Sequence, residues 1–256
     1  MADFKFNLTS IKTINQIKPK LIFSALVLVS ILFNSCDYDR IRAKGEVTEV
    51  FYGFSDYSEL RVSDAFNVYV SFSDTEESIH IRANDNLHDK IIVKNEDNKL
   101  YIKLKNFTYI RGNATLDAYI VTNDISNFDI AGASHLYLED EWTSENGDIE
   151  LTGASEFSGE VNIERLNINL HGASNLDIYG NVDYLNADLS GSSDIRDYDL
   201  IVNRLNMELS GASDAFLTVN ESIDIKATGA STFNYKGEAV IDREELAGAS
   251  EIRNRN

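Results

Sequence analysis

The chain has 256 residues and a formal net charge of −19, with 42 acidic and 23 basic side chains. This excess of acid argues against a nucleic-acid ligand, because phosphate backbones are bound by clustered Lys and Arg. The sequence holds a single cysteine, which excludes a disulfide within it, so stability has to come from the packed core.

The first 35 residues have the features of a secretory signal peptide. Four lysines precede an apolar run over residues 21–33. Thirteen residues are too few to span a bilayer, which takes ~20, but they suit the apolar part of a signal. We therefore expect residues 1–35 to be a signal peptide that is removed.

The segment before Cys36 resembles the lipobox of bacterial lipoproteins. It reads Leu32-Phe33-Asn34-Ser35, with Phe33 where leucine is usual. The resemblance implies cleavage before Cys36 and acylation of its thiol, and more than one acyl chain gives a stable anchor. We expect a lipidated tether over 36–44 and a cell-envelope location, as an outer-membrane lipoprotein facing the periplasm or the outside. The alternative is an ordinary secreted protein with a free thiol.

Cleavage would also change the charge of the chain. Residues 1–36 carry four lysines and one aspartate, so their loss takes the net charge from −19 to −22. A charge of this size argues against electrostatic docking of the whole molecule on anionic lipid. It is typical of a solvated acidic surface that resists aggregation.

The tripeptide Gly-Ala-Ser recurs through the second half of the chain. It stands at six places, and Gly191-Ser192-Ser193 fills a further slot with one substitution; the glycines are Gly132, Gly153, Gly172, Gly191, Gly211, Gly229 and Gly248. Successive glycines are 18 to 21 residues apart. Self-similarity at a fixed period of this size is typical of a solenoid, in which each repeat packs on its neighbours.

Apolar and polar residues alternate on both sides of each tripeptide. Positions two and four before the glycine, and four after it, are apolar in nearly every repeat, while the positions between are polar. This pattern predicts two short strands per repeat, each with one buried face. We therefore predict an all-β fold, a right-handed parallel β-helix with one turn per ~19 residues and neighbouring strands ~4.8 Å apart.

The tripeptide is interpreted as the corner of each turn. Glycine allows a bend that a Cβ would obstruct, alanine is expected to point inward, and serine to hydrogen-bond between turns or to nearby backbone. A mostly asparagine column five positions before the glycine is predicted to form a ladder. Because every repeat carries these columns, we interpret them as structural. The alternative is a repetitive ligand-binding face.

Residues 45–122 lack the tripeptide but also have the pattern of β structure. Alternation predicts strands over 46–52, 66–72, 78–82, 90–94, 100–105 and 115–121, with a turn at 94–99. No linker follows, so we expect residues 45–256 to form a single β-helix domain. Within it, 45–122 is an irregular N-terminal region that covers one end, and 123–256 holds the regular repeats, ending in a polar stop that includes Glu244.

Several segments resemble the putative auto-transporter adhesin, head GIN domain family. They are residues 61–68 (RVSDAFNV), 85–87, 98–102, 125–134 (ISNFDIAGAS) and the later Gly-Ala-Ser turns, and the similarity covers residues 57–252. The resemblance implies an all-β fold like a right-handed β-helix in a secreted or lipid-anchored envelope protein. The family label also implies adhesion, without naming a ligand.

No catalytic signature is present in the sequence, so we expect no enzyme activity, no cofactor and no metal. The four histidines are scattered, and His135 and His171 fall in polar columns that should face solvent. The carboxylates of Asp194, Asp197 and Asp199 could hold calcium, but their spacing fits no known calcium loop.

One break in the repeat is a candidate ligand site. Residues 139–142 read Glu-Asp-Glu-Trp, in the longest repeat and with the only tryptophan. Trp142 could stack on a sugar ring beside Glu139 and Glu141. The alternative, which we favour, is an enlarged turn whose tryptophan packs on the coil.

Three functions remain open on the sequence alone. The first, which we favour, is a non-catalytic envelope lipoprotein that displays a rigid β-helix for adhesion or scaffolding, with a surface glycan or a protein as ligand. The second is a carbohydrate-active protein, which predicts a groove with two carboxylates roughly 5–10 Å apart. The third is an envelope sensor or assembly partner recognised through a flat or apolar patch.

Overall fold

The computed structural model describes residues 39–256. The expected signal peptide and Cys36 lie outside the described residues. The elements of the described chain are strands, except for one short 3-10 helix, η1 (Asp85–Lys90). No helix within residues 39–256 is long and apolar enough to span a membrane. The predicted all-β fold is confirmed.

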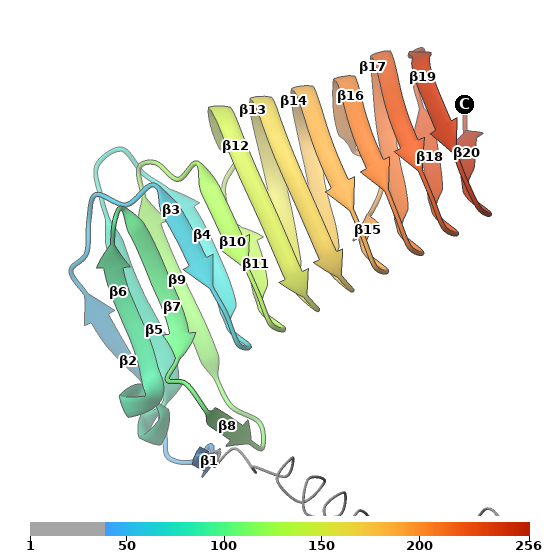
Figure 1. The fold of residues 1–256 in the computed structure, drawn as a ribbon. Coiled ribbons are helices and arrows are strands. Elements are labelled where there is room, and N and C mark those ends of the chain that lie inside the picture. Colours follow the sequence, from blue (N-terminus) through green and yellow to red (C-terminus); the bar gives the residue numbers. More distant parts are fainter. Residues whose placement is uncertain (1–38) are drawn as a thin grey trace, which may run out of the picture. The chain divides into compact units, whose positions relative to one another are not determined.

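Two ladders of parallel strands, one on each side of the corner, make up the solenoid (Figure 1). The first runs through β7 (Lys99–Leu104), β3 (Glu59–Val62), β10 (Asn127–Ile130), β12 (Trp142–Gly153), β13 (Glu156–Gly172), β14 (Asn175–Leu189), β16 (Leu200–Leu209), β17 (Asp214–Ala227) and β19 (Val240–Leu246).

The second ladder follows the corner in each turn. It runs through β9 (Leu116–Thr122), β4 (Asn67–Phe72), β11 (His135–Leu138), β13, β14, β15 (Asp194–Ile195), β17, β18 (Thr232–Lys236) and β20 (Glu251–Asn254). The long strands β13, β14 and β17 belong to both ladders, because each runs from one corner through a bend to the next corner.

The glycine corners stack in vertical register, as the repeat predicts. All seven glycines have φ between 77° and 93°. From Ala154 to Ala249, the residue after each glycine donates its N–H to the carbonyl oxygen of the glycine one turn earlier, at 2.7–2.8 Å. A Cβ on any of the last six glycines would lie 2.4–2.6 Å from that same oxygen. Glycine is therefore required twice, by the backbone angle and by the close approach of the next turn.

The expected orientation of the tripeptide side chains is wrong for alanine. The alanines of the corners are exposed, whereas the serines from Ser134 to Ser231 are fully buried. The alternation of the strands continues through the corner, so every even position from the glycine faces inward. Ser134 accepts the Phe66 N–H at 3.3 Å. The later corner hydroxyls donate locally; Ser174, for example, donates to the carbonyl oxygen of His171 at 3.0 Å. Five other corners repeat this bond at 2.8–3.1 Å.

The predicted asparagine ladder is confirmed on the outer face of the first ladder of strands. Asn167 donates to Asp148 at 2.9 Å, and Asn206 donates to Asn186 at 2.7 Å. These bonds join side chains of neighbouring turns, because each pair occupies the same register position. The amides therefore reinforce the backbone ladder along the solenoid.

The core is a column of apolar side chains between the two ladders. It runs without interruption from Tyr57 to Tyr235. Phe128 and Phe157 meet edge to face, with ring centroids 5.2 Å apart. Residues 40–256 form one compact unit, and this core lies wholly within it.

Antiparallel strands close the N-terminal end. β6 (Ile91–Glu96) pairs with β7, β5 (Ser78–Asn84) with β9, and β2 (Val47–Tyr52) with β5. The predicted turn at 94–99 is confirmed as the connection from β6 to β7, where Asp97 and Asn98 have positive φ. We call β2, β5, β6, η1 and their connections the cap.

The stack begins earlier than the repeats indicate. Asp64, with φ of 81°, occupies the corner position directly before Gly132, and its carbonyl oxygen accepts the Ala133 N–H at 2.7 Å. Aspartate can occupy this corner in place of glycine because its carboxylate has a partner. It accepts a hydrogen bond from the Leu104 N–H of the adjacent strand β7 at 2.8 Å. Residues 59–72 therefore form a regular turn inside the region expected to be irregular.

The expected tether is also shorter than predicted. Asp39–Arg42 forms strand β1, which pairs with β8 (Thr108–Arg111) in a separate two-stranded sheet. The Ala43 N–H donates to the Arg111 carbonyl oxygen at 3.0 Å. The segment fits a strand because its partner β8, which the alternation pattern did not reveal, offers a free edge.

A pair of glycine substitutions separates the two reasons for glycine at the corners. Gly211 and Gly112 both have positive φ, but only Gly211 faces a carbonyl oxygen, at 2.5 Å from an added Cβ, whereas nothing lies within 4 Å at Gly112. We expect Gly112→Ala to lower the unfolding free energy by about 1–2 kcal/mol through backbone strain. Gly211→Ala should cost at least about 3 kcal/mol, because it also breaks a hydrogen bond between turns. Equal losses in urea unfolding would contradict the stacked corner.

Candidate functional site

The predicted sugar-stacking role of Trp142 is contradicted by its burial. The side chain is 2% exposed. Its indole N–H donates to the Ile125 carbonyl oxygen at 2.8 Å, and its ring packs edge to face on Phe128 at 4.9 Å. An added Cβ at Gly147 would lie 2.6 Å from the indole, so this glycine makes room for the ring. Trp142 is a core residue, as the favoured alternative states.

The two carboxylates predicted beside Trp142 are exposed and held by local contacts. Glu139 accepts a hydrogen bond from the Ser71 hydroxyl at 2.8 Å, and Glu141 accepts one from Thr143 at 3.4 Å. The structure therefore does not bring Glu139, Glu141 and Trp142 together around a shared space. The acids lie on the surface and the ring lies in the core.

A groove begins directly after this segment, at the bend between β12, β13, β14 and β16. Its volume is about 410 Å³. Four successive turns line it, and the residues are Thr143, Ser144, Glu145, Asn162, Ile163, Glu164, Asn181, Val182, Asp183, Ile201 and Asn203. We call this set the bend groove.

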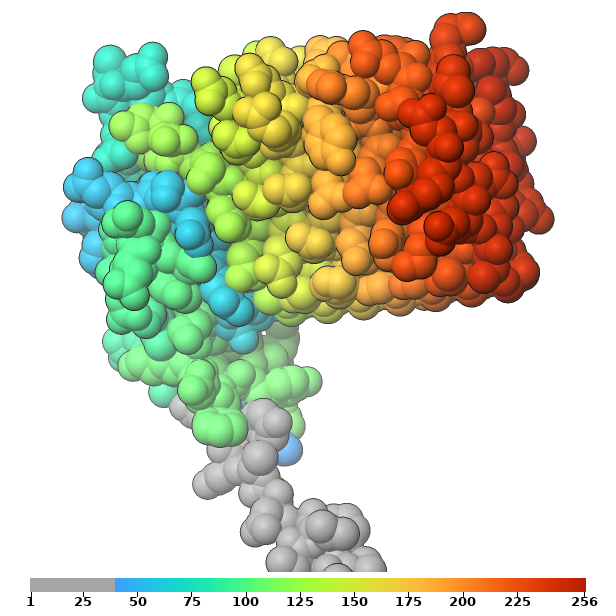
Figure 2. Space-filling view, turned by 45° about the horizontal axis from the view of Figure 1, so that its top comes forward, coloured from blue at the N-terminus to red at the C-terminus, as the bar shows by residue number. Residues whose placement is uncertain are grey.

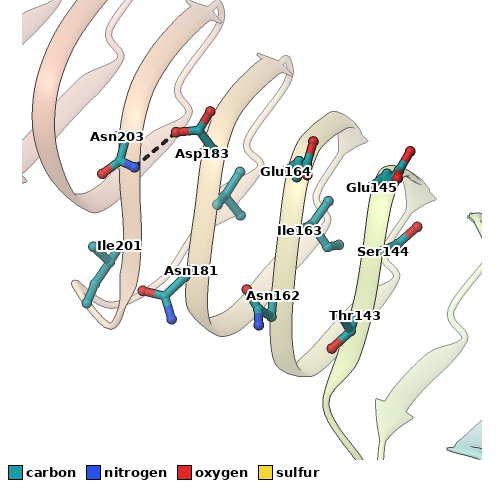
Figure 3. A pocket seen from close by; sticks show the side chains of 11 residues that line it. Thr143, Ser144, Glu145, Asn162, Ile163, Glu164, Asn181, Asp183, Ile201 and Asn203 are labelled. Atoms are coloured by element: carbon teal, nitrogen blue, oxygen red, sulfur yellow. Dashed lines mark hydrogen bonds between the residues drawn. The ribbon is translucent and has the colours of Figure 1, made fainter.

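The lining of the bend groove is arranged in three parallel rows (Figure 3). One row presents a hydroxyl and two amides before it ends in an aliphatic group; its members are Thr143, Asn162, Asn181 and Ile201. The opposite row is acidic over three turns and ends in an amide, with Glu145, Glu164, Asp183 and Asn203. Between them lie Ile163 and Val182, which are 3% and 2% exposed and belong to the core, so the apolar side chain open to the groove is Ile201, 39% exposed.

The acidic row is partly neutralised by its own neighbours. The Asn203 amide donates to Asp183 at 3.0 Å, and the Arg204 guanidinium pairs with the other oxygen of the same carboxylate. These hydrogen bonds, that of Asn203 first, lower the pKa of Asp183. Glu164 lies 3.6 Å from Arg165. Asp183 therefore stays ionised and acts as a hydrogen-bond acceptor.

This geometry suits a ligand that is rich in hydroxyl groups. Asparagine amides both donate and accept, carboxylates accept from hydroxyls, and the exposed Ile201 side chain can contact the C–H face of a sugar ring. The groups recur at the rung spacing of ~4.8 Å, so a polymer of similar period can make the same contact in successive turns.

Sequence reasoning missed the bend groove, although a signal was present. Asn162 and Asn181 both stand nine positions after their corner glycines. In the next turn the repeat is one residue longer, and Ile201 occupies the equivalent position. The asparagine column therefore ends after two turns and is hard to recognise. The carboxylates were missed as well, although Glu164 and Asp183 follow the two asparagines by two positions with one buried residue between, so alternation places them on the same face.

A second surface feature is an aromatic ladder across five adjacent strands. Phe51, His80, Tyr119, Tyr69 and Tyr137 stack in this order, with ring centroids 4.7–5.3 Å apart. Their faces pack on one another, so the ladder offers ring edges rather than open faces to a ligand. It joins the cap strands β2 and β5 to β9 and to the first two turns of the solenoid, which indicates a structural role.

The aspartates considered for calcium do not converge. Asp197 and Asp199 are exposed, while burial chiefly raises the pKa of the half-buried Asp194. Within residues 39–256, no three His, Cys, Asp or Glu side chains are placed to hold a metal ion together.

Comparisons with known structures agree with this architecture. The solenoid is similar to a putative adhesin from Bacteroides fragilis, with a TM-score of 0.78, 21% identity, and coverage of 84% of this chain and 100% of that one. It is also similar to a putative lipid binding protein from Parabacteroides distasonis, with a TM-score of 0.71, 16% identity, and coverage of 85% and 100%. At these identities the likeness shows the fold alone.

A family model settles the wider relationship. A search of curated proteins gave no match. The model described as "Putative auto-transporter adhesin, head GIN domain" matches residues 56–239. This match spans the cap except for β2, the turn at Asp64 and all but the last corner of the solenoid. The chain therefore belongs to the putative auto-transporter adhesin, head GIN domain family.

Proposed function

We propose that this chain is a lipid-anchored protein of the cell envelope that uses the bend groove to bind a glycan in an adhesion role, without catalysis. The observation that carries the proposal is the groove itself. It presents amide, hydroxyl and carboxylate groups in register over four turns, on a scaffold whose strands are fixed by continuous ladders.

The charge of the bend groove favours a neutral glycan. Glu145, Glu164 and Asp183 line one side, and residues 123–256 carry 26 acidic and 8 basic side chains. An anionic polysaccharide would meet repulsion along the whole solenoid. A neutral polysaccharide meets only hydrogen-bonding groups and the exposed Ile201 side chain.

A binding role is supported over hydrolysis by the state of Asp183. A glycosidase needs one carboxylic acid with a raised pKa that can protonate the leaving oxygen. The pKa of Asp183 is instead lowered by Asn203 and Arg204. This carboxylate is suited to accept hydrogen bonds from sugar hydroxyls.

The anchor in this proposal is an acyl group on Cys36. The preceding signal-like segment supports export, and the family name supports a place at the cell envelope. An outer-membrane lipoprotein, facing the periplasm or the outside, fits these features. The solenoid would then be held at the membrane from its cap, since the chain enters the described fold through β1.

The glycan proposal is tested with purified protein on immobilised neutral polysaccharides (dextran, mannan and β-glucan) and on alginate as the anionic comparison. We expect binding to at least one neutral polymer and none to alginate. Asn162→Ala combined with Asn181→Ala should weaken that binding at least about tenfold, because buried sugar hydroxyls lose their partners. The soluble reaction mixture is assayed for released sugar.

The matched control changes two asparagines outside the bend groove. Asn186 and Asn206 belong to the structural ladder, so their replacement by alanine should leave glycan binding unchanged. Equal loss in both variants, or binding to no neutral polymer, would refute the groove as a glycan site. Release of sugar would favour the carbohydrate-active alternative.

The anchor is tested separately in cells. We expect the chain recovered from membranes to begin at Cys36 and to carry the mass of acyl groups, and Cys36→Ser to move the protein to the soluble envelope fraction. Intact-mass measurement and membrane fractionation give these results. A wild-type chain with an unmodified thiol would rule out lipidation, whatever the outcome of the glycan assay.

A further inference from the structure

One end of the cap gathers basic and aromatic side chains. It consists of residues 40–44, 85–90 and 103–111, which we call the tip. The tip carries seven basic side chains, Arg40, Arg42, Lys44, Lys90, Lys103, Lys105 and Arg111, and two acidic ones, Asp85 and Asp89, with a third acid, Asp39, directly before it in β1. This balance is the reverse of that in residues 123–256, where 26 acidic side chains face 8 basic ones.

Two aromatic side chains of the tip are open to solvent. Phe107 is 60% exposed and Tyr109 is 55% exposed. Phe107 has φ of 63°, a conformation that bulky residues rarely adopt. The core of the domain uses neither ring, although burial of such a side chain is strongly favourable. Exposed aromatics beside Lys and Arg are typical of surfaces that enter the membrane interface.

Hydrogen bonds join the three segments of the tip to one another. The Lys105 N–H donates to the Lys90 carbonyl oxygen at 2.7 Å. The Asn86 amide donates to the Arg42 carbonyl oxygen at 3.0 Å, and the Lys44 N–H donates to Asn86 Oδ1 at 2.9 Å. The exposed rings are therefore held on a fixed surface. Strands β1 and β8 of the tip lie at the lower end of the fold in Figure 1.

Chain length limits how far the tip can lie from the anchor. Cys36 stands four residues before Arg40, and four extended residues span at most ~14 Å. If Cys36 is acylated, as the proposed function has it, Arg40 lies within that distance of the bilayer surface. The tip is the part of the fold that contains Arg40, so it is the part brought closest to the headgroups.

From these observations we propose that the tip rests on the phospholipid surface that carries the anchor. Phe107 and Tyr109 enter the interface, and the basic side chains contact the phosphates of anionic lipids. The inference rests on the proposed lipid anchor. It adds a fixed orientation, in which the cap faces the membrane and the bend groove is carried away from it.

The acidic solenoid does not prevent this contact. At physiological ionic strength charges are screened beyond ~8 Å, so only side chains near the lipid surface feel its negative potential. The tip is within reach and basic, whereas the solenoid is acidic and extends from the other side of the cap. Repulsion of the solenoid and attraction of the tip favour the same orientation. The net charge of the whole chain is therefore a poor guide to its behaviour at a membrane.

The single cysteine and single tryptophan allow a direct test. Residues 36–256 contain the complete compact unit, and Cys36 can be coupled to a maleimide lipid in vesicles of equal parts phosphatidylcholine and phosphatidylglycerol. Phe107→Trp places a second tryptophan at the tip. With brominated acyl chains in the vesicle, we expect the added fluorescence to fall at least twofold, while the buried Trp142 serves as the unquenched internal reference.

Two matched variants control this experiment. Tyr179→Trp adds a tryptophan at a 48% exposed position on β14, away from the tip, and should not be quenched. Phe107→Trp combined with Lys105→Glu and Arg111→Glu should lose most of its quenching, because the charge that attracts the lipid is reversed. Unchanged far-ultraviolet circular dichroism and Trp142 emission show that each variant is folded.

The outcomes separate this inference from the proposed anchor. Absence of quenching at Phe107→Trp, or equal quenching at Tyr179→Trp, would overturn the membrane-facing tip. Quenching that persists after charge reversal would overturn the role of the basic side chains. Because the tether is chemical, these results do not depend on acylation in the cell, which the mass measurement on native membranes decides.

Discussion

The hydrogen bond between successive corners is the contact on which the solenoid depends. Each corner N–H donates to the glycine carbonyl oxygen one turn earlier, and this approach leaves no space for a Cβ. Because the bond fixes one point of every turn, the two ladders keep a constant register, and the inward positions align into one apolar column. Figure 2 shows the result as a continuous surface, coloured in sequence order along the stack.

The repeat allowed much of this fold to be predicted, because the stacked turns repeat one local environment. The repeat period predicted the turns of the solenoid, and the alternation of apolar and polar residues predicted most of the strands. Ala173 was expected to point inward because the corner was treated as an interruption, although alternation passes through it and turns Ser174 inward instead. The turn at Asp64 was hidden because its corner carries no glycine. The bend groove was missed because its asparagine column is short: Asn162 and Asn181 occupy the same repeat position, but Ile201 ends the column in the next turn.

Position on the scaffold links the two proposed surfaces. The bend groove lies in β12 to β16, several turns from the cap, while the tip lies beyond the strands of the cap. A rigid stack between them would hold the groove at a set distance from the membrane. The acidic solenoid contributes by keeping the molecule off anionic surfaces, so that contact is limited to the basic tip. Adhesion and anchoring would thus be assigned to opposite parts of one continuous sheet.

Distances between spin labels on the exposed corner alanines test the stacked register most directly. In a Cys36→Ser background, cysteine pairs join Ala154 to Ala212, to Ala230 and to Ala249, which lie three, four and five turns apart. Double electron–electron resonance should give mean distances that increase by ~4.8 Å for each added turn. Distances that fail to rise in equal steps along this series would contradict the account.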